Sequence, residues 1–104
     1  MPEIREITSG LRFPEGPIAM ADGSVILVEI AAGRLTRVLP DGTKQTVAEP
    51  GGGPNGAAIG PDGKCYVCNN GGFSWVEEDG LLRTGGTAED YKTGRIERID
   101  LDTG

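Results

Sequence analysis

The sequence contains no histidine. This absence excludes a Ser-His-Asp triad, and any zinc site with histidine ligands, within these 104 residues. No apolar run is long enough to span a bilayer. The charged N-terminus also lacks the apolar region of a signal peptide. We therefore expect a cytoplasmic protein that does not bind membranes.

Basic residues are outnumbered by acidic ones, 10 to 16, which gives a formal net charge of -6. An acidic surface repels the phosphate backbone, so we expect no nucleic-acid partner. The same surface is compatible with the binding of cations.

Cysteine is scarce, and the two cysteines form one Cys-X-X-Cys motif at Cys65 and Cys68. One interpretation is a redox or metal pair. The other is that both lie in a β-strand, where residues three apart point to opposite faces. We favour the second interpretation, because the chain has no second ligand pair and no helix is expected after the motif.

Glycine and proline, by contrast, are abundant, with 18 and 7 residues, and they recur in order. Residues 14–23 read PEGPIAMADG and residues 54–63 read PNGAAIGPDG. The similarity continues from 24–30 to 64–70 and from 33–42 to 94–102, and it leaves an insertion at 70–93 in the second copy. Such self-similarity is typical of repeat architectures.

Each copy reads as short strands joined by Asp-Gly turns, with a fourth strand in the first copy. This is the unit of a β-propeller blade. We therefore predict an all-β protein with one blade at 11–50 and a second at 51–104, the latter carrying the inserted loop 70–93. Residues 77–91 would form a turn of helix at most. Residues 1–10 are expected to hold a lone strand that closes the propeller ring.

In a propeller, the inner strands begin near the central channel. Glu15 and Asn55 would open the inner strands of successive blades, on the face where Glu29 and Asn69 end the second strands. Carboxylate and amide oxygens that converge there suit a divalent cation such as Ca²⁺. The alternative for Asn55 is a turn cap, a common role of asparagine. A glutamate near the channel axis needs a counter-ion, so Glu15 favours the functional interpretation.

The ordered turns resemble those of the senescence marker protein/gluconolactonase/regucalcin-like family. The residues that carry the resemblance are Phe13-Pro-Glu-Gly-Pro17, Asp22-Gly23, Glu29, Gly33-Arg-Leu35, Pro40-Asp-Gly42, 52–63 and 66–73. The resemblance implies part of a six-bladed β-propeller with a divalent metal in its channel, usually Ca²⁺, with Zn²⁺ or Mn²⁺ as alternatives. It also implies hydrolysis of sugar lactones or related esters.

The family resemblance assigns roles to five residues. Glu15 matches a metal ligand, Asn55 and Asn69 are expected to line the pocket, and Phe73 and Trp75 are expected to form a lid. Packing within the loop is an equal alternative for Trp75. Two blades supply neither the remaining ligands nor a general base, so this chain is expected to be an inactive N-terminal part of such an enzyme. A non-catalytic propeller binding module and an inactive truncated product are the competing interpretations.

Overall fold

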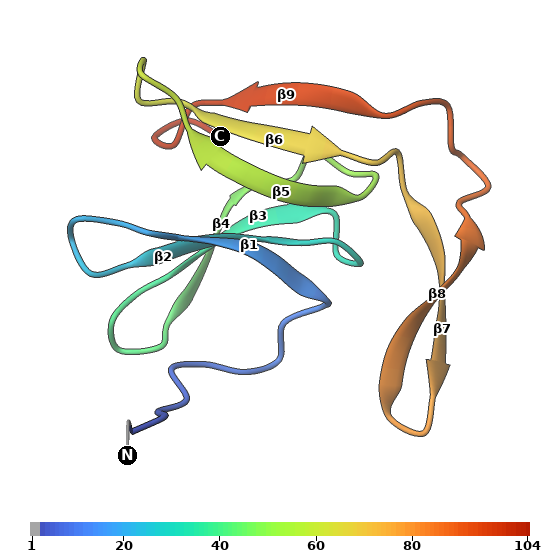
Figure 1. The fold of residues 1–104 in the computed structure, drawn as a ribbon, viewed down its shortest axis with the longest axis horizontal. Helices are drawn as coiled ribbons and strands as arrows, with labels where there is room; N and C mark the ends of the chain where they lie inside the picture. Colours follow the sequence, from blue (N-terminus) through green and yellow to red (C-terminus); the bar gives the residue numbers. More distant parts are fainter. Residues whose placement is uncertain (1–2) are drawn as a thin grey trace.

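All regular structure is β-strand in residues 3–104, the part of the chain that the computed structural model describes (Figure 1). The strands are β1 (Pro14–Ala19), β2 (Val25–Glu29), β3 (Arg34–Val38), β4 (Lys44–Ala48), β5 (Pro54–Ile59), β6 (Cys65–Asn69), β7 (Phe73–Glu78), β8 (Leu81–Thr87) and β9 (Arg95–Ile99). The prediction of an all-β chain is confirmed. Over the same residues, no helix has the length and apolar character needed to cross a membrane.

The first sheet contains β1, β2, β3 and β4 in chain order, with every neighbouring pair antiparallel. Its strands lie where the repeat predicts them. Gly23 and Gly42 close the Asp-Gly turns at φ of 88° and 90°, in the left-handed region that glycine enters without steric cost. The turn chemistry of the sequence therefore fixes the order of this sheet.

The second sheet contains β5, β6 and β9, and the insertion between β6 and β9 folds into a separate hairpin of β7 and β8. No helix forms over residues 77–91, but the insertion, predicted as a loop, contains two strands. Asp79 and Gly80, at φ of 54° and 77°, form the left-handed pair that favours a two-residue hairpin turn.

Residues 3–12 lead into β1 without joining a sheet. Ile4 is 96% exposed and has no apolar cover. A strand at residues 1–10 that closes a propeller ring would pair with a blade other than these two sheets. Its ring-closing role therefore stays a prediction. Residues 1 and 2 lie outside the described part.

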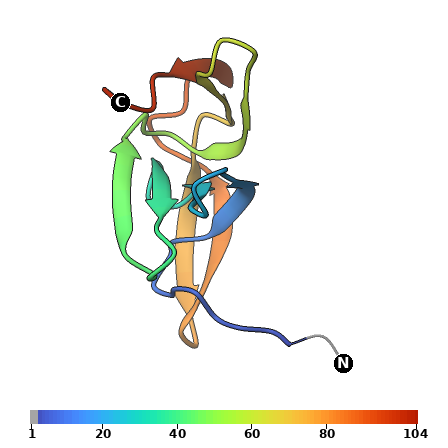
Figure 2. The same cartoon turned by 90° about the vertical axis from the view of Figure 1, so that its left-hand side faces the viewer.

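The core lies between the two sheets, which Figures 1 and 2 show stacked on one another. The buried cluster consists of Ile26, Val28, Leu35, Cys65, Val67 and Ile99. Strand β5 packs against β1 and β2. Within β6, Cys65 is buried and Cys68 is exposed. The prediction that the two cysteines face opposite sides of a strand is therefore confirmed.

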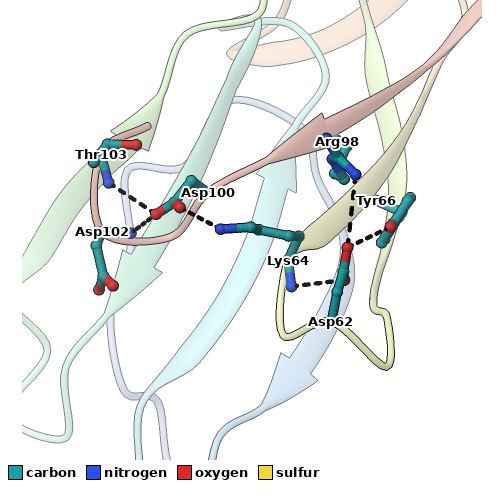
Figure 3. A network of polar contacts seen from close by, with 7 residues as sticks. All are labelled: Asp62, Lys64, Tyr66, Arg98, Asp100, Asp102 and Thr103. Carbon is teal, nitrogen blue, oxygen red and sulfur yellow. Dashed lines mark hydrogen bonds and ion pairs between the residues drawn. The ribbon is translucent and has the colours of Figure 1, made fainter.

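A polar network joins the turn before β6 to the turn after β9 (Figure 3). The Nζ of Lys64 donates to Asp100, and the Tyr66 hydroxyl donates to Asp62 at 2.7 Å. The hydrogen bond from Lys64, with two backbone N–H donors, lowers the pKa of Asp100 to about 2. These turns lie at the opposite end of β6 from Asn69, so the network holds the end of the second sheet remote from Asn55.

Candidate functional site

The two Pro-X-Gly turns lie against one another. A Cβ added to Gly16 would lie 3.2 Å from the Cα of Gly56, so these backbones are in van der Waals contact. The residues before them, Glu15 and Asn55, are both exposed. Neighbouring strands thus present a carboxylate and an amide from adjacent turns, as the repeat predicted.

Each Pro-X-Gly turn also interrupts the pairing of its strand. In the first sheet the register shifts between Glu15 and Ile18, and in the second it shifts between Pro54 and Ala57. These shifts place an extra residue on β1 and on β5, which is a β-bulge. Such bulges bend the strand and change the direction of its side chains, and they recur here at the two candidate ligand positions.

Glu15 presents one hard oxygen donor group at this surface. Within residues 3–104, its carboxylate takes part in none of the ion pairs. The same residues contain no group of three or more histidine, cysteine, aspartate or glutamate side chains that could hold a metal ion. Because Ca²⁺ takes six to eight oxygen ligands, Glu15 and Asn55 fit part of a calcium site and not a whole one.

Glu29 is fully buried at the end of β2, opposite Pro14. Its carboxylate accepts hydrogen bonds from Arg34 Nε at 2.6 Å, from the Thr36 hydroxyl and from the Arg12 backbone N–H at 2.8 Å. Burial alone would raise the pKa of Glu29. The hydrogen bonds outweigh burial and lower this pKa to about 2. Glu29 is therefore a charged anchor inside the first sheet.

Asn69 is only 3% exposed at the end of β6. Its Oδ1 accepts from the backbone N–H groups of Gly53 and Gly71, both at 2.9 Å. Its Nδ2 donates to the Gly51 carbonyl at 2.8 Å and to Glu97 Oε1 at 2.9 Å. These four bonds use the full capacity of an amide side chain. The structure places Asn69 inside the second sheet, and its contact with a ligand stays a prediction.

The β7–β8 hairpin contacts the segment that leads into β1. The rings of Phe13 and Trp75 lie 5.1 Å apart between centroids, and those of Phe73 and Trp75 lie 5.9 Å apart, nearly perpendicular. Arg12 Nη1 and Glu77 Oε1 form an exposed ion pair at 2.9 Å. Trp75 thus packs on its own hairpin and on Phe13, two residues before Glu15.

A groove of about 560 Å³ runs between the hairpin and this segment. Its lining residues are Leu11, Arg12, Phe13 and 77–82. The sequence interpretation placed Phe73 and Trp75 in this insertion but missed Arg12 and Phe13. Phe13 has a visible signal, since it directly precedes the Pro-Glu-Gly-Pro turn. The hairpin partner of that ring, however, cannot be deduced from local sequence.

A repeated antiparallel sheet, bulged at a carboxylate-bearing turn of its first strand, places the chain among all-β repeat proteins of the propeller kind. Residues 13–101 match the SMP-30/gluconolactonase/LRE-like region, and the chain belongs to that family. A search of curated proteins found no match to the chain.

Proposed function

We propose that the chain forms the first two blades of a six-bladed β-propeller that hydrolyses sugar lactones or related esters with the help of a divalent metal. The first blade would span 11–50, and the second would span 51–104 with its insertion at 70–93. Membership of the gluconolactonase-type family supports the reaction class. The contact between the Gly16 and Gly56 turns supports the proposal for the site, because Glu15 and Asn55 directly precede these two glycines.

Glu15 would hold the metal, with further ligands supplied by blades beyond these two. Ca²⁺ is the cation of first choice for exposed carboxylate and amide oxygens, with Zn²⁺ and Mn²⁺ as the alternatives to test. When bound, such an ion polarises a carbonyl group and lowers the pKa of water.

The other site residues would act on the substrate. The exposed Asn55 amide offers both a donor and an acceptor to the hydroxyl groups of a sugar lactone. The hairpin with Phe73 and Trp75 would cover one side of the pocket and limit the size of the substrate. We also propose that the protein is cytoplasmic, that its partner is the small lactone or ester substrate, and that it binds neither nucleic acid nor membranes.

Activity of the complete propeller tests these roles. Lactone hydrolysis with added Ca²⁺ is compared between the parent protein, Glu15→Ala and Asn55→Ala. We expect Glu15→Ala to abolish activity and to weaken metal binding far more than Asn55→Ala does. Equal and mild effects of the two substitutions would contradict the ligand assignment.

A non-catalytic propeller binding module is the second candidate. It would share the blade repeat but would lack converging acidic ligands at the channel, so the exposed carboxylate of Glu15 argues against it. The two candidates differ in calcium dependence. A catalytic propeller of this kind gains thermal stability with Ca²⁺, because a ligand that binds only the folded state stabilises it. A binding module, or an inactive truncated product, shows no such gain.

A further inference from the structure

We propose that Phe13 and Trp75 are positioning residues for Glu15, so that hairpin β7–β8 and a cation at Glu15 are coupled. The inference rests on the proposed function, since it takes Glu15 as the metal ligand. It adds a coupling between the hairpin and the cation, which neither the blade repeat nor the assignment of Glu15 as a ligand requires.

The backbone of Phe13 is in an unfavourable conformation. Its φ is 59°, in the left-handed region, whereas bulky L-residues rarely adopt positive φ. Surrounding contacts must hold such a residue in place. Strain at this position is notable because Phe13 immediately precedes the Pro-Glu-Gly-Pro turn.

The segment is held from both sides, by the exposed ion pair between Arg12 and Glu77 and by the following contacts. The Phe13 carbonyl accepts a hydrogen bond from the Ile30 backbone N–H at 3.1 Å. The preceding N–H, that of Arg12, donates to the buried Glu29 carboxylate at 2.8 Å. The Phe13 ring packs on Trp75 at 5.1 Å, tilted by 51°. Glu29 is the last residue of β2 and Ile30 follows it, whereas Trp75 belongs to the hairpin.

The connection from Phe13 to Glu15 is short and stiff. Only Pro14 separates them, and the proline ring fixes its own φ. A rotation about the Phe13 backbone is therefore passed to Glu15 instead of being absorbed in between. The bulge that follows Glu15 begins at Gly16, whose φ of 55° also requires a special conformation.

The second copy of the repeat lacks this arrangement. Gly53 occupies the position of Phe13, and a Cβ there would lie 2.1 Å from Asn70 Oδ1. Glycine has no side chain, so the turn that carries Asn55 has no ring at this position to pack on the hairpin. The aromatic contact thus belongs to the copy that carries the carboxylate.

Coupling between two sites is reciprocal. If docking of Trp75 on Phe13 favours the ligand geometry of Glu15, cation binding must in turn favour the docked hairpin. A substrate that moves the β7–β8 hairpin would then change the affinity of the protein for the metal. Conversely, a bound metal would hold the hairpin in its docked position before the substrate binds.

The test is a calcium titration of the complete protein and its variants by calorimetry. Trp75→Ala removes the contact, Trp75→Phe keeps a ring there, and Val76→Ala shortens the neighbouring side chain, which the strand directs to the other face of β7. We expect Trp75→Ala to weaken calcium binding about tenfold, the value of a good aromatic contact. Trp75→Phe should recover most of this affinity, and Val76→Ala should leave it unchanged.

A second variant tests the contact from the side of Phe13, and its hydrogen-exchange readout does not require Trp75→Ala to fold. Phe13→Asn removes the ring but retains a residue that tolerates positive φ. In a double-mutant cycle, its effect on calcium affinity should largely disappear when Trp75 is already alanine. Hydrogen exchange supplies an independent readout: Ca²⁺ should slow exchange in 73–78 and 81–87 of the parent protein but not of Phe13→Asn.

The outcomes distinguish a failure of the proposed coupling from a failure of the proposed metal-binding function. If Glu15→Ala abolishes calcium binding while Trp75→Ala and Phe13→Asn leave it unchanged, the coupling is wrong and the ligand assignment stands. Additive effects of the two aromatic substitutions would also overturn the coupling. If Glu15→Ala itself leaves calcium affinity unchanged, the proposed function fails.

Discussion

Asn69 occupies in the second sheet the place that Glu29 occupies in the first, and each side chain anchors the segment that leads into its inner strand. Glu29 Oε1 accepts from the Arg12 N–H at 2.8 Å, and Asn69 Oδ1 accepts from the Gly53 N–H at 2.9 Å. Both residues end a second strand opposite the proline of the inner turn. The same device therefore ties each Pro-X-Gly turn to its sheet.

The two anchors differ in where the negative charge lies. In the first sheet the carboxylate is Glu29 itself, held by Arg34. In the second sheet Asn69 is neutral and donates to Glu97, which pairs with Arg95 at 2.9 Å. The carboxylate thus lies on the second strand in the first sheet, as Glu29, and on the third strand in the second sheet, as Glu97. In both sheets an arginine, Arg34 or Arg95, opens the third strand and pairs with that carboxylate.

The first prediction concerns acid stability. The pKa of Glu29 is about 2 in the folded protein, below its usual value of 4.5. A lowered pKa contributes stability above the unfolded value, and that contribution is lost as pH falls toward the folded value. We expect about 2–3 kcal/mol of unfolding free energy to disappear between pH 4.5 and 2. Urea unfolding at a series of pH values measures it.

Glu29→Gln is the control for this dependence of the unfolding free energy on pH. Asp100 also has a pKa near 2 and loses its charge in the same pH window. The part of the pH dependence that is lost in Glu29→Gln is caused by ionisation of Glu29. An unchanged pH dependence of the unfolding free energy would show that ionisation of Glu29 contributes nothing to stability.

The second prediction concerns Asn69. Asn69→Ala leaves two buried backbone N–H groups and the Glu97 carboxylate without their partner. We expect a loss of about 3 kcal/mol in unfolding free energy. Asn55→Ala is the matched control, because this asparagine is exposed, and it should change stability by less than about 0.5 kcal/mol. Similar costs at both positions would contradict the anchor role.

The third prediction tests the contact between the two turns. Gly16→Ala places a methyl group 3.2 Å from Gly56 Cα at a φ of +55°. We expect a destabilisation of about 1–2 kcal/mol in thermal unfolding. Gly63→Ala is the control, since its φ of +77° imposes a similar backbone strain and a Cβ there meets nothing within 4 Å. An equal loss of stability in both variants would mean that the strain at Gly16 accounts for the whole effect and that the two turns do not touch.

The fourth prediction concerns the two thiols. Cys68 is exposed, whereas Cys65 is fully buried and burial raises its pKa. Because the thiolate is the reactive form, iodoacetamide should modify Cys68 in the native protein and spare Cys65 until unfolding. Mass spectrometry of timed samples measures this. Modification of both cysteines at one rate would place Cys65 at the surface.

Much of the fold follows from local sequence. The Asp-Gly turns and the β-branched segments between them predict β1 to β6 and β9, because turn chemistry and period-two alternation are local signals. The hairpin at 73–87 was not predicted, although Asp79-Gly80 is a hairpin signal, because residues 70–93 break the repeat and were interpreted as an inserted loop.

The candidate site was predictable only in part. The repeat places Glu15 beside Asn55, and the contact between their turns agrees with it. The burial of Asn69 depends on Gly53, Gly71 and Glu97, which come together only in the folded sheet. The partner of Phe13 likewise lies on a distant hairpin, and such long-range packing leaves no periodic trace in sequence.

The role of Glu15 as a metal ligand is tested most directly by a calorimetric titration of the complete protein and of Glu15→Gln with Ca²⁺. This substitution keeps the size of the side chain and removes its charge. Glu78→Gln, on the exposed hairpin, is the control for a change in net charge. We expect calcium binding to be lost in Glu15→Gln and retained in Glu78→Gln. Unchanged calcium affinity in Glu15→Gln would contradict the role of Glu15 as a metal ligand.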